Sequence, residues 1–316
     1  MNRKSLLFVI AFLAIIIIGL ELFARYGLGL GDPPLTIGDA EIDYIFTPNQ
    51  NCNRFGNRIV YNDASMRCDF NVLDNFARNH GRRVFVVGDS VVNGGVLTDH
   101  HNLATTILQE KLDSDRKNIQ VCHVSAGSWG PGNYAAYFRR YRNLVGTNDV
   151  VVIEVNSHDL WEDDPMKTCG KKVGRDIALP DHKPWCALWD GFDRYFMPRM
   201  RRLVGRKSVN TKVDVPKWGV DSENALALYN LAMMKDIYSL PWAGRYMLIH
   251  RSRAESELGD ETVGERKFRD FAEMNCIPYS VLILNPAEDY RDKIHLTVTG
   301  QGKMAAAIYS LISKDL

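Results

Sequence analysis

The chain has 316 residues, of which 46% are hydrophobic, so it is long enough for one large domain or two small ones around a substantial core. Its formal net charge is +1, from 39 Lys and Arg residues against 38 Asp and Glu residues. A balanced charge provides no long-range field to attract nucleic acid, which argues against nucleic acid as a partner.

The N-terminus carries an apolar stretch from Leu6 to Leu20, preceded by Arg3 and Lys4. About 20 apolar residues span a bilayer, so we predict that residues 1–31 form a membrane anchor and its linker. A cleaved signal peptide is the alternative, although the small residues of a cleavage site do not follow the apolar core. Positive charge before the helix predicts a cytoplasmic N-terminus, with the body on the periplasmic or extracytoplasmic side.

Residues 32–82 lack helical periodicity and are rich in Asn, Asp, Gly and Arg, with short β-like pieces such as 58–61. We expect an extended arm that packs on the main domain.

From residue 83 onward, apolar β-branched runs alternate with amphipathic segments, a pattern typical of βαβ units. The expected strands are 84–87, 119–124, 150–155, 246–249 and 279–284, and the expected helices are 103–112, 133–144, 222–238, 265–275 and 302–312. Continuous apolar strands indicate a sheet covered on both faces. We therefore predict that 83–316 is an α/β domain, a three-layer α/β/α fold with a doubly wound, mostly parallel sheet. Such sheets bind ligands beyond the carboxyl ends of their strands.

The alternation of apolar strands and amphipathic helices stops over about 161–217. This stretch is rich in proline, aromatic and basic residues and is too long for an ordinary connection. We expect an insertion over the active-site edge. Its aromatic residues are Trp161, Trp185, Trp189, Phe192, Tyr195 and Phe196, and basic residues follow them. These side chains suit a sugar chain or anionic lipid headgroups, or they form the insertion's own small core with a solvated face.

Six cysteines fit an oxidising compartment. We expect disulfides between Cys169 and Cys186 and between Cys52 and Cys68, whereas Cys122 and Cys276 are expected to be buried and unpaired. No Cys-x-x-Cys motif occurs, so we expect neither a metal nor another cofactor.

Two short motifs supply the parts of a nucleophilic site. Gly88-Asp89-Ser90-Val91 follows the first strand of the domain, and Asp292-Lys293-Ile294-His295 precedes the last helix. A serine needs a base to take its proton, and a carboxylate fixes the tautomer of that imidazole. Taken alone, Ser90 also fits a helix N-cap, and Asp-x-x-His is a common sequence. Gly88–Gly95 lacks the lysine of a P-loop, and Ser90 is not in a Gly-x-Ser-x-Gly elbow.

With these motifs the chain resembles the SGNH (GDSL-type) hydrolases. The resemblance implies Ser90 as nucleophile, His295 as base and Asp292 as the residue that orients it. In Ser125-Ala126-Gly127-Ser128-Trp129-Gly130, Gly127 takes the place of the family's oxyanion glycine, acting with the Ser90 N–H, and Gly130 and Gly132 are possible substitutes.

The third motif departs from the family pattern, because Asn156-Ser157-His158-Asp159 stands where Gly-x-Asn-Asp is expected. His158 occupies the place of the oxyanion asparagine, and its ring N–H can donate as an amide does. Asn156 is the alternative donor. A histidine that merely caps the loop with Asp159 is the structural alternative.

The resemblance implies a serine esterase that removes acetyl or similar acyl groups from a carbohydrate or polysaccharide through an acyl-enzyme. The N-terminal segments resemble anchored members linked to bacterial extracellular polysaccharide systems. An O-acyltransferase uses the same residues. A non-catalytic polysaccharide-binding or assembly protein with a degenerate site, and a lipid-directed esterase or thioesterase, are further alternatives. The sequence does not determine the oligomeric state.

Overall fold

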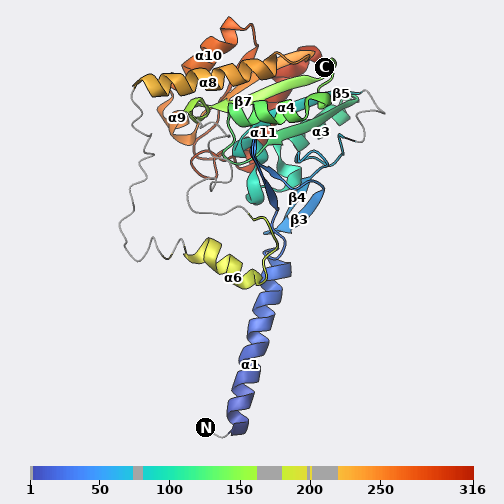
Figure 1. The fold of residues 1–316 in the computed structure, drawn as a ribbon, viewed down its shortest axis with the longest axis vertical. Coiled ribbons are helices and arrows are strands. Elements are labelled where there is room, and N and C mark those ends of the chain that lie inside the picture. The colour runs from blue at the N-terminus through green and yellow to red at the C-terminus, as the bar shows by residue number, and fades with distance from the viewer. Residues whose placement is uncertain (1–2, 74–80, 162–179, 198–199, 201–219) are drawn as a thin grey trace.

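The computed structural model describes residues 3–73, 81–161, 180–197, 200 and 220–316 (Figure 1). The expected insertion at 161–217 is therefore described only in part.

The N-terminal helix α1 (Arg3–Leu22) projects away from the rest of the chain and has no buried residue (Figure 1). It continues as a π-helical segment, η1 (Phe23–Gly27). Arg3–Gly27 is long and apolar enough to cross a membrane, as an anchor or as a signal sequence.

Two antiparallel hairpins follow the N-terminal helix. One pairs β1 (Thr36–Asp39) with β2 (Asp43–Phe46), and the other pairs β3 (Gln50–Arg54) with β4 (Asn57–Tyr61). Phe55 and Gly56 form the tip of the second hairpin with φ of 53° and 80°, the left-handed geometry that a two-residue hairpin turn requires. Ile42, Tyr44 and Met66 from this region are buried in the main core.

The main domain is built on a parallel five-stranded sheet in the order β6-β5-β7-β8-β9. The strands are β5 (Arg82–Gly88), β6 (Ile119–Ser125), β7 (Val150–Asn156), β8 (Gly244–His250) and β9 (Tyr279–Leu282). The first strand of the domain lies inside the sheet, with the second beside it at one edge, which is the doubly wound arrangement.

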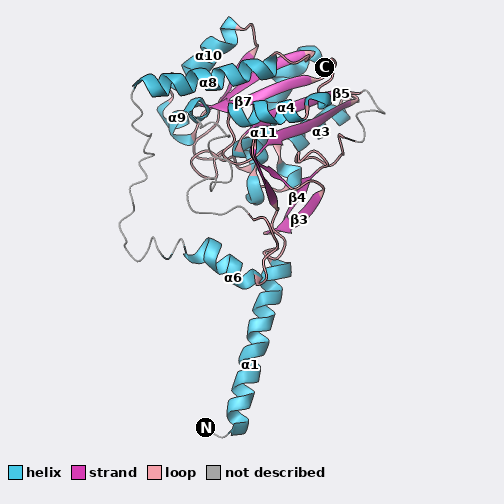
Figure 2. Cartoon of the chain, in the orientation of Figure 1, coloured by secondary structure: helices cyan, strands magenta, loops and turns pink. Residues whose placement is uncertain are grey.

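Helices cover both faces of this sheet (Figure 2). On one face, α3 (Ala104–Ser114) and α11 (Val298–Ile312) bury side chains such as Leu108 and Ile308 against Val84. On the other face, α4 (Pro131–Arg140), α8 (Val220–Tyr238) and α10 (Val263–Met274) pack against Phe85 and its neighbours. The predicted three-layer α/β/α class is confirmed.

The helix boundaries differ from expectation where local capping decides them. The helix expected over 133–144 begins at Pro131, because proline suits the first helical turn, and ends at Arg140. The last helix begins at Val298 rather than at residue 302, because the Thr297 hydroxyl accepts the Gly300 N–H at 3.2 Å. A short helix, α2 (Ser90–Asn93), begins at Ser90 itself, with Asp89 as its N-cap. Among the described residues, α6 (Ala187–Gly191) and α9 (Arg253–Leu258) are short helices that the sequence did not predict, and a π-helical segment, η6 (Phe192–Phe196), follows α6.

The expected disulfide between Cys52 and Cys68 is wrong, since both thiols are free. Cys68 instead places its Sγ 3.1 Å from Sγ of Cys122, which is buried in β6. Cys276 is exposed, contrary to expectation, because it follows α10 in a turn. The other expected pair involves Cys169, which lies outside the described residues.

Candidate active site

Ser90, His295 and Asp292 form one continuous hydrogen-bonded chain. Nε2 of His295 lies 2.9 Å from Oγ of Ser90, and its Nδ1 lies 3.0 and 2.9 Å from the two carboxylate oxygens of Asp292. The serine and the histidine are 205 positions apart in the sequence, and the end of β5 and the loop before α11 bring them together. This geometry allows the imidazole to take the serine proton while the carboxylate holds the opposite nitrogen.

Backbone constraints fix the position of Ser90 at the end of β5. Asp89 precedes α2, and its Oδ1 accepts the Val91 N–H at 2.7 Å. Gly88 is required because a Cβ there would lie 2.7 Å from Oε2 of Glu154 and 2.5 Å from a Val92 methyl. Ser90 is the first residue of a one-turn helix, and any side chain at Gly88 would displace Glu154 or Val92.

Asp292 is held by its own loop in the ionised form. Its Oδ1 accepts the backbone N–H groups of Ile294 at 3.1 Å and His295 at 2.9 Å. Partial burial raises the pKa of this carboxyl, but these hydrogen bonds and the His295 ring outweigh burial and leave the pKa below its usual value. A carboxylate that stays charged stabilises the imidazolium formed when the serine loses its proton.

Gly127 lies with Ser90 in the wall of one pocket of about 210 Å³. The Tyr44 hydroxyl, from β2, donates to the Gly127 carbonyl at 2.8 Å, and the Trp129 indole N–H donates to the Tyr44 carbonyl at 3.2 Å. The hairpin region therefore holds the loop in which Gly127 lies. No motif pointed to Tyr44, because its contact partner is 83 positions away in the sequence.

The two candidate donors of the third motif occupy different environments. Asn156 is buried, and its Nδ2 lies 3.4 Å from Oδ2 of Asp89, directly before the nucleophile. His158 is exposed, and its backbone N–H donates to Oδ1 of Asn156 at 2.9 Å. Asp159 Oδ2 accepts the Asn156 N–H at 2.8 Å and so closes the turn.

A cluster of buried titratable groups lies beside the turn that carries Ser90. Glu154 of β7 is fully buried, with Oε1 3.5 Å from Nδ1 of the equally buried His250 of β8. Burial raises the pKa of Glu154 to about 8, whereas burial and the neighbouring Glu154 charge raise the pKa of Asp89 to about 7. Burial also lowers the pKa of His250 to about 4. The two carboxyls titrate as a pair, and at neutral pH the cluster holds at least one proton on carboxyl oxygen.

Sequence reasoning missed this cluster, although one signal was available. The expected strand 150–155 is one of the continuous apolar runs, yet Glu154 interrupts it. A lone carboxyl in a strand covered on both faces indicates a buried group with a specific environment.

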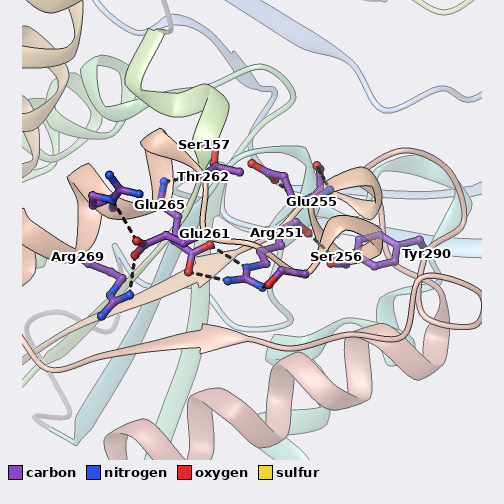
Figure 3. Close-up of polar contacts among 12 residues, drawn as sticks. Ser157, Arg251, Glu255, Ser256, Glu261, Thr262, Glu265, Arg269 and Tyr290 are labelled. Carbon is purple, nitrogen blue, oxygen red and sulfur yellow. Dashed lines mark hydrogen bonds and ion pairs between the residues drawn. The ribbon is translucent and has the colours of Figure 1, made fainter.

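A polar network connects the segments that follow β7 and β8 with α10 and with Tyr290 (Figure 3). Arg251, just after β8, makes two hydrogen bonds of 2.8 and 3.0 Å to Glu265 of α10, and its carbonyl accepts the Tyr290 hydroxyl. Ser157, after β7, lies 2.7 Å from the hydroxyl of Thr262, which caps α10. The network thus ties the third-motif turn to the loop that leads to His295.

Within the described part of the chain, no group of three or more His, Cys, Asp or Glu side chains is placed to hold a metal ion.

No family model and no curated protein matches the sequence. Solved structures that align with it include LAE5, an alpha/beta hydrolase enzyme from the metagenome of Lake Arreo, Spain, at 15% identity over 73% of this chain and 94% of that chain, with a TM-score of 0.45. The psychrotrophic esterase EstA from Pseudoalteromonas sp. aligns at 13% identity over 73% and 97%, with a TM-score of 0.41. A carbohydrate acetylesterase family member from Sinorhizobium meliloti aligns at 12% identity over 74% and 99%, with a TM-score of 0.40. Sequence identities of 12–15% with TM-scores of 0.40–0.45 carry no argument about the activity of this chain.

Proposed function

We propose that this protein is an SGNH-type serine esterase that hydrolyses O-acyl esters on a carbohydrate. The observation that carries the proposal is the hydrogen-bonded chain from Ser90 Oγ through the His295 ring to Asp292. Ser90 Oγ attacks the ester carbonyl while His295 Nε2 takes its proton. The bond from the carbonyl carbon to the sugar oxygen then breaks, and the protonated ring gives its proton to that leaving oxygen, so the sugar departs as an alcohol. His295 then activates water, which releases the acid from the acyl-serine.

The negative charge that develops on the carbonyl oxygen needs donors. We assign this role to the backbone N–H groups of Ser90 and Gly127, with His158 or Asn156 as the third donor. Loss of one such donor typically lowers turnover by about 100- to 1000-fold. Asn156 contacts Asp89, the residue before Ser90, whereas the His158 side chain is exposed.

An acetyl ester on a sugar suits the dimensions and lining of the pocket around Ser90. Its volume of about 210 Å³ is small, and it combines the aromatic side chains of Tyr44 and Phe46 with polar groups of Thr36 and Arg54. Aromatic faces pack against sugar rings, while polar groups bind hydroxyls. An incoming sugar hydroxyl in place of water makes the same residues an O-acyltransferase, and comparing acetate release with acetyl transfer to added saccharide separates the two reactions.

The proposal includes a retained membrane helix with the catalytic body on the extracytoplasmic side, since Arg3 and Lys4 precede the apolar segment. Protease accessibility of the body in sealed vesicles tests this orientation.

The test of the activity is Ser90→Ala, with Ser114→Ala on the exposed surface of α3 as its control. We expect Ser90→Ala to lower the turnover of p-nitrophenyl acetate and of an acetylated polysaccharide by on the order of 10⁴-fold or more, with an unchanged Tm. A fluorophosphonate should label the wild type and Ser114→Ala but not Ser90→Ala. Saccharide binding by an unlabelled wild type would favour a non-catalytic binding protein instead.

A further inference from the structure

A second cavity, of about 590 Å³, lies between the end of the N-terminal helix and the catalytic domain. Leu20 and Phe23 contribute to it from the helix end, Leu97 from the loop after α2, and Leu188 and Phe192 from α6 and η6. None of the described residues that line it carries a charge. Its size is that of a pocket for a small-molecule ligand, and its lining suits a hydrocarbon chain. We call it the apolar groove.

The apolar groove adjoins the pocket that contains Ser90. Val96 and Tyr195 line both, so the two hollows lie on either side of these residues. The Tyr195 hydroxyl accepts from Nε and Nη2 of the buried Arg54 at 3.2 and 2.8 Å, which fixes this shared wall. A ligand with its reacting group at Ser90 would reach the groove by passing over this wall.

The end of the N-terminal helix is bonded to α6, and this contact forms one side of the groove. Glu21 Oε1 accepts the Ala187 N–H at 2.9 Å, and Oε2 accepts the Leu188 N–H at 2.8 Å. Arg25 bonds to Glu21 at 2.8 Å and to the Trp185 carbonyl at 2.8 Å. Figure 1 shows α6 beside the upper end of α1. Glu21 at the end of α1 thus caps the first turn of α6. A retained membrane anchor keeps this contact, whereas cleavage of a signal sequence would remove it.

Exposed aromatic side chains lie in and beside α6, next to its contact with the end of the N-terminal helix. Trp185 is 96% exposed and Trp189 is 67% exposed, and Trp189, Phe192 and Phe196 stack in succession with ring centroids 5.8 and 4.9 Å apart. Tryptophan and other aromatic residues concentrate at the boundary between lipid and water, and a short helix with one apolar face lies along that boundary. These residues favour a position of the groove at the membrane surface.

We propose that the substrate is an acylated saccharide carried by a membrane-embedded hydrocarbon chain, with the sugar at Ser90 and the chain of its aglycone in the apolar groove. This inference rests on the proposed esterase function and names its substrate class. The pocket around Ser90 includes Arg54 and Arg194, whose charged groups favour a hydroxylated head over methylene groups, whereas the groove beyond Val96 is uncharged. In this proposal the hydrocarbon lies on the alcohol side of the ester, and the acyl group that is released is short.

The test compares three esters on the full chain in phosphatidylcholine nanodiscs: 6-O-acetylglucose, dodecyl 6-O-acetyl-β-glucoside and 6-O-dodecanoylglucose. Each methylene taken out of water strengthens association by about fourfold, whether it enters the groove or the bilayer beside it, so we expect kcat/KM for the dodecyl acetyl ester to exceed that for 6-O-acetylglucose by at least about tenfold. Equal values for these two esters, or a higher value for the dodecanoyl ester than for the dodecyl acetyl ester, would overturn the proposal.

A matched pair of variants separates the groove from simple partitioning into the membrane. Leu97→Glu places a charge in the groove, and Leu258→Glu places the same charge on α9, where Leu258 is 74% exposed. Leu97 is 55% exposed, so both substitutions are compatible with folding. We expect Leu97→Glu to abolish the preference for the dodecyl ester while keeping turnover of 6-O-acetylglucose, and Leu258→Glu to retain both. Equal preference in the two variants would refute the groove as the chain site.

A binding measurement that needs no turnover distinguishes failure of this inference from failure of the esterase function. Dodecyl β-glucoside, which has no ester, is titrated against each protein while tryptophan fluorescence is followed. Weaker binding to Leu97→Glu than to Leu258→Glu supports the groove even if no ester is hydrolysed, whereas equal binding refutes it even in an active esterase.

Discussion

Glu154→Gln should remove a large pH dependence from the stability of the fold. In the wild type, burial raises the pKa of Glu154 from its ordinary 4.5 to about 8, so the folded protein holds a proton that the unfolded chain releases at lower pH. Because the folded state binds more protons than the unfolded state over this range, stability is greatest below about pH 4.5 and falls as the pH rises toward 8. At roughly 1.4 kcal/mol per pKa unit, the loss over the whole range is on the order of 5 kcal/mol. Glutamine has a similar shape and stays neutral throughout.

The assay is the Tm of the full chain in detergent micelles at pH 5 and pH 8. One kcal/mol moves the Tm of a domain of this size by about 2–4 °C, so we expect the wild type to lose on the order of 10 °C more than Glu154→Gln between these pH values. Part of this difference comes from Asp89, because the Glu154 charge also raises the pKa of that carboxyl. Glu110→Gln, an exposed position on α3, serves as the control and should follow the wild type. Parallel curves for the wild type and Glu154→Gln would refute the assignment of a proton to this buried cluster.

Two further predictions concern the region between the N-terminal helix and the sheet. Tyr44→Phe removes the hydrogen bond to the Gly127 carbonyl, so we expect kcat for p-nitrophenyl acetate to fall by about fivefold with little change in KM; an unchanged kcat would mean that this loop keeps its position without the hydroxyl. Mild oxidation of the folded protein should join Cys68 to Cys122, whose sulfurs already lie 3.1 Å apart, rather than to Cys52; peptide mapping that finds Cys52 linked to Cys68 would contradict the arrangement of these strands.

The sheet and its main helices could be predicted from the sequence because each depends on local signals. Apolar runs such as 84–87 and 119–124 identify strands directly, and their alternation with amphipathic segments determines the fold class. The residues Ser90, Asp292 and His295 could be selected because they stand at strand and helix ends, where a doubly wound sheet gathers its ligands. Their distances required the structure.

Other features depend on contacts between distant segments, which no local pattern records. Cys52 and Cys68 are close in sequence, yet Cys68 packs against Cys122 of the edge strand. The buried cluster needs β7 and β8 to be adjacent before Glu154 and His250 can meet. The contact between Glu21 and the start of α6 joins residues more than 160 positions apart, so the sequence alone gave no reason to connect the helix end with the aromatic segment.

A buried side chain from residues 32–82, that of Arg67, is hydrogen-bonded to the segment that follows Ser90. Arg67 is 1% exposed, and its guanidinium donates to the carbonyls of Asn93 at 2.6 Å, Gly95 at 2.7 Å and Thr98 at 2.6 Å, in the stretch that follows the nucleophile. A fragment that starts at residue 83 would leave these three oxygens without their donor. Soluble versions of this protein for crystallisation or screening should therefore be cut upstream of Thr36.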